Sequence, residues 1–219
     1  MITREDIKNN EAISALISRA DETLLAMGYT EHAFAHVTKC AHLAAELLGK
    51  MGYPERECEL AWIAGYLHDI GNVINRQDHA HNGALMTFQL LGQLGMSYDE
   101  IGIICAAIGH HDEETAIPVN SVAAALILAD KSDVRRSRVR NRDTLKFGIH
   151  DRVNYAVEES NLTVNTDTKD VSLVLAIDTN ICPLMEYFEI FLGRMLLCRR
   201  AANYLGYKFH LDINHVSVL

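Results

Sequence analysis

Apolar residues recur every three or four positions through the first two thirds of the chain, as in helices that bury one face. Before about residue 143 no alternating, strand-like pattern is present. Capping signals support the helical interpretation, because Thr3 precedes Asp6, and Ser97 precedes Glu100, by three residues. The periods predict helices over residues 3–28, 31–51, 54–69, 79–95, 97–109 and 121–130.

After about residue 143 the spacing of the apolar residues changes to every second position. Apolar residues alternate with polar or small ones over 162–166 and 171–177, on either side of a predicted turn, which indicates a β-hairpin. A long amphipathic helix follows over 183–205, and alternation returns over 207–213. These periods predict a β-β-α-β arrangement.

The chain is therefore expected to be mainly α, with a helical bundle over 1–150 and a small α+β appendage over 151–219. Whether the appendage belongs to the same globule is left open. A lone hairpin is marginally stable and its open edges need cover, so the sheet should pack on its own helix or on a second subunit. We expect a homodimer in which the helical part carries the chemistry.

Composition narrows the class of protein. The 219 residues are 49% hydrophobic and carry a formal net charge of -9, which argues against binding to DNA or to anionic membranes. The N-terminus lacks a signal-peptide pattern, and no run approaches the roughly 20 apolar residues of a membrane span. Five cysteines without a Cys-x-x-Cys pair indicate reduced thiols. These features predict a cytoplasmic protein.

The main chemical feature is the stretch Leu67-His68-Asp69-Ile70-Gly71, at the end of an apolar helix. Gly71 is expected to be a left-handed stop just after the helix. An adjacent imidazole and carboxylate can bind a metal ion, although such a dipeptide also fits a surface helix end. Further donors in the chain favour the metal interpretation. They are His36, His79, His110, His111 and Asp130.

Asp130 is the most informative of these residues. It ends eight consecutive apolar residues, where an ionised carboxylate costs several kcal/mol unless a cation or hydrogen-bond donors compensate it. The alternative is that Asp130 faces outward and pairs with arginines one turn later. The donor set contains no thiolate, which favours a catalytic site over a closed structural one.

Three stretches together resemble the HD phosphohydrolase superfamily. They are His36-Val-Thr-Lys-Cys-Ala41, His68-Asp69-Ile70-Gly71 and Ala129-Asp130-Lys-Ser-Asp133. They occur in the superfamily's order between residues 31 and 142. The resemblance implies an HD-type helical bundle and a metal site made by His36, His68, Asp69 and Asp130.

The additional histidines resemble branches that bind two or more metals. His79-Ala-His-Asn-Gly83 resembles a His-x-x-x-Gly element, and His110-His111 resembles the double histidine of the HD-GYP phosphodiesterases. Gly-Tyr-Pro is missing after it, and Ile127–Lys131 looks closer to the symmetrical diadenosine tetraphosphate hydrolases. The resemblance implies two divalent ions, from among Fe, Mn, Zn, Ni and Mg. His32 is left open as a ligand or a solvent-facing residue.

Such a site would activate water without a side-chain nucleophile. The interpretation assigns catalytic roles to His68, Asp69, Lys131 and Asp133. Asp133 could orient a ligand or a water, or it could instead form a salt bridge to an arginine. Substrate phosphate is expected to bind Lys131, Arg135 and Arg136, although a solvated face explains some of these charges equally well. These three belong to a basic island, which consists of Lys131, Arg135, Arg136, Arg138, Arg140 and Arg142.

The predicted function is hydrolysis of a nucleotide or another small phosphorylated compound, as a phosphomonoesterase, phosphodiesterase or pyrophosphohydrolase. Two alternatives stay in view. One is a regulatory module without catalysis, and the other is a di-iron oxygenase on the same scaffold.

Overall fold

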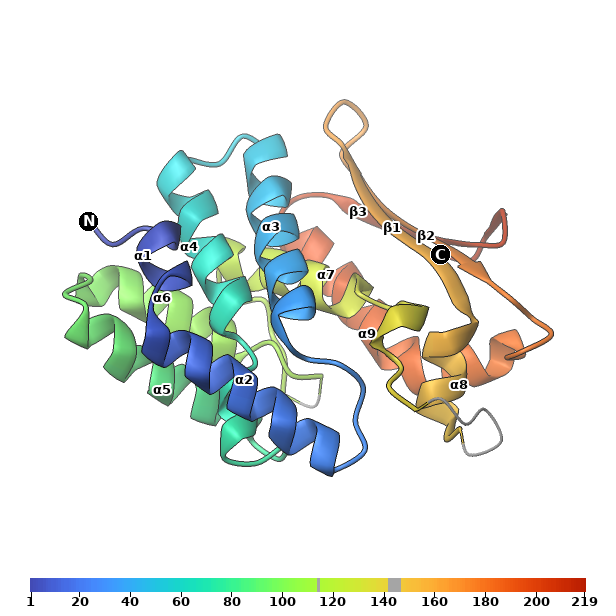
Figure 1. Ribbon diagram of the computed structural model, residues 1–219. Coiled ribbons are helices and arrows are strands. Elements are labelled where there is room, and N and C mark those ends of the chain that lie inside the picture. The colour runs from blue at the N-terminus through green and yellow to red at the C-terminus, as the bar shows by residue number, and fades with distance from the viewer. Residues whose placement is uncertain (114, 142–146) are drawn as a thin grey trace.

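The computed structural model describes residues 1–113, 115–141 and 147–219 (Figure 1). It confirms a mainly helical fold with a small C-terminal α+β part. The helices that precede the sheet are α1 (Arg4–Lys8), α2 (Glu11–Ala26), α3 (Phe34–Lys50), α4 (Glu55–Leu67), η1 (Ile70–Val73), α5 (His79–Gln93), α6 (Tyr98–Gly109), α7 (Ser121–Ser132), η2 (Arg136–Arg138) and α8 (Ile149–Ala156).

Helix α7 lies at the centre of the molecule. It packs against α3, α4 and α6 on one side and against α9 (Leu184–Tyr204) on the other (Figure 1). Every residue from Val122 to Ala129 is fully buried, which explains the uninterrupted apolar run. Because α7 ends inside this packing, Asp130 lies in the interior of the molecule and not on its outer surface.

The N-terminal prediction needs one correction. The single helix expected over residues 3–28 is two helices, α1 and α2, separated at Asn9 and Asn10. The Asn10 side chain accepts a hydrogen bond from the Ile13 backbone N–H, so Asn10 is the N-cap of a second helix, α2. Periodicity missed the break because apolar positions on both helices face the same core. The capping box of Thr3 and Asp6 is present as predicted.

The role predicted for Gly71 is also wrong. Gly71 lies within η1 and is absent from the glycines with positive φ. A Cβ at this position would lie 2.0 Å from the His79 carbonyl oxygen and 2.4 Å from the Gly83 nitrogen. Glycine is therefore needed for the close approach of η1 to α5, and Gly83 forms the other side of that contact.

A second close approach joins α3 to α4. A Cβ at Gly65 would lie 2.7 Å from Ala41 Cα, so these two helices pack backbone to backbone. Through the two contacts, the segments that carry His36, His68 and His79 meet at one place.

The C-terminal part has the expected β-β-α-β order with two additions. Its strands are β1 (Val157–Asn165), β2 (Asp170–Ile177), β3 (Lys208–Ile213) and β4 (Val216–Ser217). Neither α8 nor β4 was expected, and β1 begins five residues before the predicted strand. The sheet order is β1-β2-β3-β4, with β1 and β2 antiparallel and β2 and β3 parallel.

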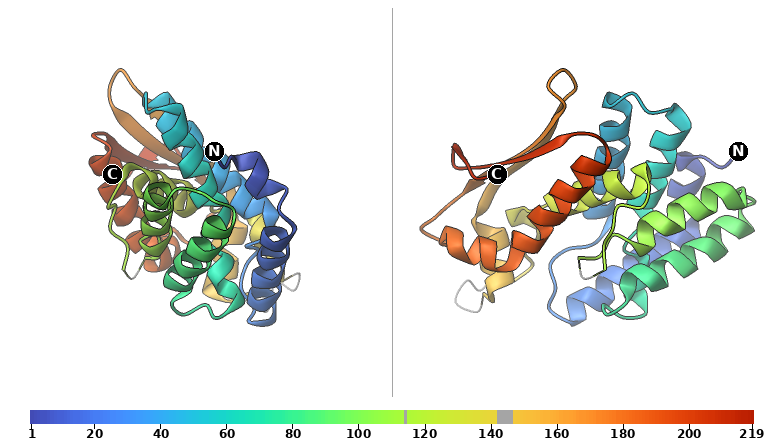
Figure 2. Two further views of the ribbon diagram at one scale, coloured as in Figure 1. Left: turned by 90° about the vertical axis from the view of Figure 1, so that its left-hand side faces the viewer. Right: turned by 180° about the vertical axis from the view of Figure 1, so that it is seen from behind.

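Helix α9 is the crossover between the parallel strands and lies between the sheet and α7 (Figure 2). Alternate residues of β2 and β3 are buried, among them Leu173, Leu175 and Leu211. One hydrophobic cluster includes these residues together with α3, α4 and α7, so the core continues across residue 150. The division into two units at that residue stays a prediction.

In the described ranges, no helix has both the length and the apolar character that crossing a bilayer requires.

Candidate metal centre

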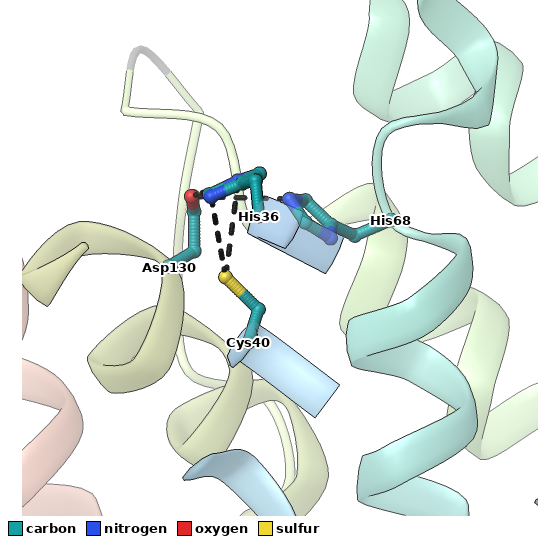
Figure 3. A group of neighbouring side chains, drawn as sticks. All are labelled: His36, Cys40, His68 and Asp130. Carbon is teal, nitrogen blue, oxygen red and sulfur yellow. Dashed lines mark hydrogen bonds and ion pairs between the residues drawn. The ribbon is translucent and has the colours of Figure 1, made fainter. Parts of the chain in front are cut away.

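Four predicted donors form a compact group at the inner end of α7. His36 comes from α3, His68 and Asp69 follow α4, and Asp130 comes from α7 (Figure 3 shows all of these except Asp69, together with Cys40). His36 Nε2 lies 3.3 Å from Asp130 Oδ1 and 3.6 Å from Asp69 Oδ2. His68 Nε2 lies 3.3 Å from Asp69 Oδ2 and 3.8 Å from Asp130 Oδ1. Ligand atoms that each lie about 2.1 Å from one ion have separations of this size.

Two further histidines extend the group on the other side of Asp69. Its Oδ1 lies 3.7 Å from His79 Nε2, which lies 3.2 Å from His111 Nε2. The ligand atoms of His68, Asp69 and His111 all lie within 4.8 Å of one another. The Asp69 carboxylate thus directs one oxygen to each side, as a ligand shared by two ions would.

The other ring nitrogen of each histidine has its own partner. His68 Nδ1 donates to the Gly65 carbonyl at 2.8 Å. His79 Nδ1 donates to the Arg76 carbonyl at 3.0 Å, and His111 Nδ1 donates to the Ile108 carbonyl at 2.6 Å. In each case the acceptor lies three residues earlier, at a helix end or turn. Since Nδ1 carries the proton, Nε2 is left as the ligand atom.

His36 is oriented by a carboxylate instead. Its Nδ1 lies 2.8 Å from Asp133 Oδ2, and Asp133 is itself fully buried. Lys39 Nζ and Arg135 Nε contact the other oxygen of Asp133 at 2.8 Å and 2.9 Å. Both sequence-based interpretations of Asp133 therefore describe real contacts, because it orients a proposed ligand and also forms salt bridges.

The neighbouring Asn72 holds the Asp69 carboxylate. Its amide donates to Asp69 Oδ1 and to the Asp69 carbonyl, both at 2.9 Å, from a fully buried position. Sequence analysis missed this residue, because the stretch after Gly71 looked like a polar connector. The signal that could have found it is an amide three residues after the carboxylate.

Two buried polar atoms at the centre are left without a hydrogen bond within the described ranges, His68 Nε2 and Asp69 Oδ2. They face each other at 3.3 Å without good hydrogen-bond geometry. Buried groups of this kind are costly unless a cation compensates them. The donor set and these orphaned atoms fit a divalent metal ion.

The electrostatics leave the two carboxylates ionised and the His79 and His111 rings neutral, which are the forms that bind metal. Burial opposes ionisation of Asp69, but His68 together with His32 and His36 outweighs it and holds the Asp69 pKa well below its ordinary value. Burial likewise opposes ionisation of Asp130, but Lys131 together with His36 and His68 outweighs it and lowers that pKa. Burial lowers the pKa values of His79 and His111, so both rings are neutral near pH 7.

Two histidines have positions that differ from the rest. His110 caps α6 and is half-buried, and the described contacts do not join it to the other donors. Its role as a ligand stays a prediction. His32 is half-buried, lies edge-on to the His36 ring with centroids 5.4 Å apart and donates Nδ1–H to the Thr30 carbonyl. It lines the cavity and is not simply solvent-facing.

Cys40 lies beside the donors, although the sequence-based donor set did not include it. It lies one helical turn after His36, fully buried, with Sγ 3.6 Å from His36 Nδ1 (Figure 3). Burial and the nearby Asp130 raise the pKa of the thiol well above its ordinary value. A neutral thiol is a poor ligand, so Cys40 packs beneath the histidine. The i, i+4 spacing was the available signal.

A cavity of about 610 Å³ opens over Asp69, His79, His111 and Asp130. This volume is in the range of small-molecule sites. Its cationic side chains are Lys131, Arg76, Arg138 and Arg194. The remaining wall comes from residues 27–30, His32, residues 148–151 and Asn154.

The basic island divides into residues that reach this cavity and residues that do not. Lys131 Nζ lies 2.7 Å from Asp130 Oδ2, and Lys131 and Arg138 line the cavity. Arg135 pairs with Asp133 and with Glu31 at 3.2 Å, outside the cavity lining.

The other island residues also have partners elsewhere. Arg136 donates to the Tyr155 carbonyl at 2.6 Å and stacks on that ring. Arg140 pairs with Asp21, and Arg142 lies outside the described residues. The substrate-binding roles of Arg135 and Arg136 stay predictions.

Comparison with known proteins agrees with this geometry. The HD domain family model matches residues 33–145, slightly more than half of the chain. A similar solved structure is the crystal structure of a predicted HD superfamily hydrolase from an uncultured Thermotogales bacterium, with 23% identity, 57% of this chain and 67% of that chain covered, and a TM-score of 0.46. Since the matched region contains the His68-Asp69 pair and its partners His36 and Asp130, the chain belongs to the HD domain family, a superfamily of metal-dependent phosphohydrolases.

Proposed function

We propose that this protein is a metal-dependent phosphohydrolase that attacks a nucleotide or another small phosphorylated compound with metal-activated water. The observation that carries the proposal is the convergence of Nδ1-anchored imidazoles and buried carboxylates at the floor of a cavity lined by cations. The lining cations favour a phosphorylated substrate over the oxygenase alternative.

Two overlapping donor sets would hold two divalent ions. His36, His68, Asp69 and Asp130 would hold one, and Asp69, His79 and His111 would contribute to the other. Four imidazoles with two carboxylates favour Fe, Mn, Zn or Ni over Mg. When bound, such ions would lower the pKa of a water ligand and polarise a phosphoryl oxygen.

The chain's own groups would orient the substrate. Lys131 Nζ lies 2.7 Å from Asp130 and both residues line the cavity, so the ammonium would contact a phosphate oxygen next to the donors. Arg76 and Arg138 add positive charge to the wall. Asp133 holds the His36 ring and is a positioning residue, because it is not among the residues that line the cavity.

The test combines metal analysis with a substrate panel. Protein purified without added metal is analysed for bound elements, stripped with a chelator and reloaded with Mn²⁺, Fe²⁺, Zn²⁺, Ni²⁺ or Mg²⁺. Bis(p-nitrophenyl) phosphate, p-nitrophenyl phosphate and nucleotides are then assayed. We expect phosphate release that depends on the reloaded metal. A fully loaded protein that releases phosphate from none of these would support the regulatory alternative, and oxygen consumption with iron would support the oxygenase.

We also propose that the protein is a cytoplasmic homodimer. The nine-residue strand β1 stands at one edge of the sheet, which motivates the dimer. Light scattering at micromolar concentration tests it, and a monomeric mass would contradict it.

A further inference from the structure

The cavity extends beyond the part of the chain that matches the HD family. That match ends at residue 145, whereas the cavity wall includes residues 148–151, Asn154 and Arg194 of α9. The C-terminal part therefore supplies a wall of the site in addition to the sheet. This differs from the expectation that the chemistry belongs to the helical part alone.

Arg194 is held in place from two sides. Its guanidinium carbon lies 4.3 Å from the ring centroid of Phe191, which is fully buried one turn earlier in α9. It also forms an ion pair with Glu113. The Arg194 side chain is 22% exposed, so the charge is pre-oriented and still accessible. Pre-orientation reduces the entropy that binding an anion would cost.

The Glu113 contact shows how close Arg194 is to the metal donors. The carboxylate oxygen of Glu113 that contacts Arg194 also lies 3.8 Å from Lys131 Nζ. Lys131 in turn lies 2.7 Å from the proposed ligand Asp130. This Glu113 oxygen therefore bridges Lys131, which lies beside the metal donors, and Arg194, which lies on the outer wall of the cavity. The two cations are therefore close enough together for two neighbouring phosphates of one substrate to contact one cation each.

We propose that Arg194 is a specificity-determining residue that binds a second phosphate of the substrate, adjacent to the phosphorus that water attacks. The preferred substrate is then a phosphoanhydride, such as a nucleoside diphosphate or a longer polyphosphate, and not a simple monoester. This inference rests on the proposed function.

The hydrolysis of such a bond is balanced without a co-reactant. The water oxygen forms a bond to one phosphorus, and the bond from that phosphorus to the bridging oxygen breaks. The bridging oxygen leaves with the electron pair on the second phosphate. One proton of the water stays with the first product, and the other passes to the second product or to solvent.

The first experiment compares Arg194→Gln with Arg200→Gln in the metal-loaded protein. Arg200 lies on the same helix, is exposed and is outside the cavity lining, so it is a matched charge control. We expect Arg194→Gln to raise KM for a nucleoside diphosphate about 10- to 100-fold, the size of a lost charge-assisted hydrogen bond. KM for p-nitrophenyl phosphate should change less than about twofold. Arg200→Gln should change neither, and Arg194→Lys should recover part of the loss.

A second experiment measures binding without catalysis. Calorimetry compares methylenediphosphonate with methylphosphonate on the wild type and the Arg194 variants, with metal content checked before and after. We expect the wild type to prefer the diphosphonate and Arg194→Gln to lose most of that preference. Thermal melting of each variant checks folding, and Arg194→Lys serves if the glutamine variant does not fold.

The outcomes separate this inference from the proposed function. The inference would be overturned if the protein hydrolyses monoesters and diphosphates and Arg194→Gln leaves its relative preference for the two unchanged. The proposed function would then still stand. An Arg194-dependent preference for diphosphonate in a protein that hydrolyses nothing would support the anion site and refute the function.

Discussion

The floor and the wall of the cavity are positioned in different ways. Three floor histidines, His68, His79 and His111, are each anchored to the carbonyl three residues earlier, within one turn of chain. The wall cation Arg194 lies more than 60 residues from Lys131 in the sequence and reaches the same cavity only through the packing of α9 against α7. Short-range anchoring makes a motif recognisable in a sequence, whereas long-range packing leaves no local pattern. The predictions below test this difference.

The largest effect on activity is expected from a change to the proposed metal donors on the floor of the cavity. Asp69→Ala removes a carboxylate that faces donors on both sides, so bound metal and phosphatase activity should both be lost. Elemental analysis and the substrate panel measure the two effects. Asp167→Ala, in the exposed turn of the β1–β2 hairpin, is the control and should keep both. An Asp69→Ala variant with full metal and full turnover would contradict the site assignment.

The next effect concerns the orientation of His36. Asp133→Asn replaces the charged acceptor of the His36 Nδ1 proton, and losing such a partner typically costs 10- to 100-fold in metal affinity. Competition with a fluorescent chelator measures the affinity. Arg136→Gln, whose side chain contacts Tyr155 instead, should leave it unchanged. Equal metal affinity in wild type and Asp133→Asn would show that Asp133 is only a salt-bridge partner.

The backbone contact under the site can be broken separately. Gly71→Ala places a Cβ against the backbone of His79 and Gly83, and should lower the free energy of unfolding by at least about 1–3 kcal/mol. Gly102→Ala is the matched control, because it lies in α6 with open space around it and should be neutral or slightly stabilising. Denaturant titration compares the two variants. A harmless Gly71→Ala would contradict the close approach of η1 and α5.

A smaller effect is expected from pH in chelator-treated protein. Burial depresses the pKa of His111 in the folded state, so its contribution to stability is complete above the unfolded pKa of about 6.5 and is lost as pH falls below it. His79 and His32 act in the same direction.

His68 acts in the opposite direction. Burial lowers its pKa, but the Asp69 carboxylate outweighs burial and raises it, so its contribution is lost as pH rises. We expect a net loss of stability between about pH 6.5 and 5.5, with a slope of up to about 1.4 kcal/mol per pH unit for each depressed histidine. Denaturation at several pH values measures it. His111→Gln should flatten the slope, and an unchanged slope would exclude His111 as a cause.

The smallest effect is expected from Arg136→Glu. Arg136 contacts the Tyr155 carbonyl and ring, outside the cavity lining, so KM for the substrate should change little. A strong rise in KM would instead support the substrate-binding role that the sequence predicted for this residue and for Arg135. Raising the salt concentration should weaken substrate binding by screening the half-buried wall cations Arg76 and Arg194.

Much of the fold was predictable because most helices bury one face and end at caps or glycines. The break at Asn10 was not, since apolar positions continue in phase with the core across it. The parallel pairing of β2 with β3 was not either, because alternation shows that a strand is half-buried and does not show its neighbour.

The sequence by itself identified the proposed metal donors, most of which the structure brings together. His68-Asp69 and Asp130 stand at the ends of apolar helices, where an unpaired charge would be costly, and His36 and His79 occupy positions of a recognisable motif. The tertiary structure alone decided which cations line the cavity. A basic residue keeps its charge wherever it lies, and only packing directs Arg138 and Arg194 to the cavity and Arg136 away from it.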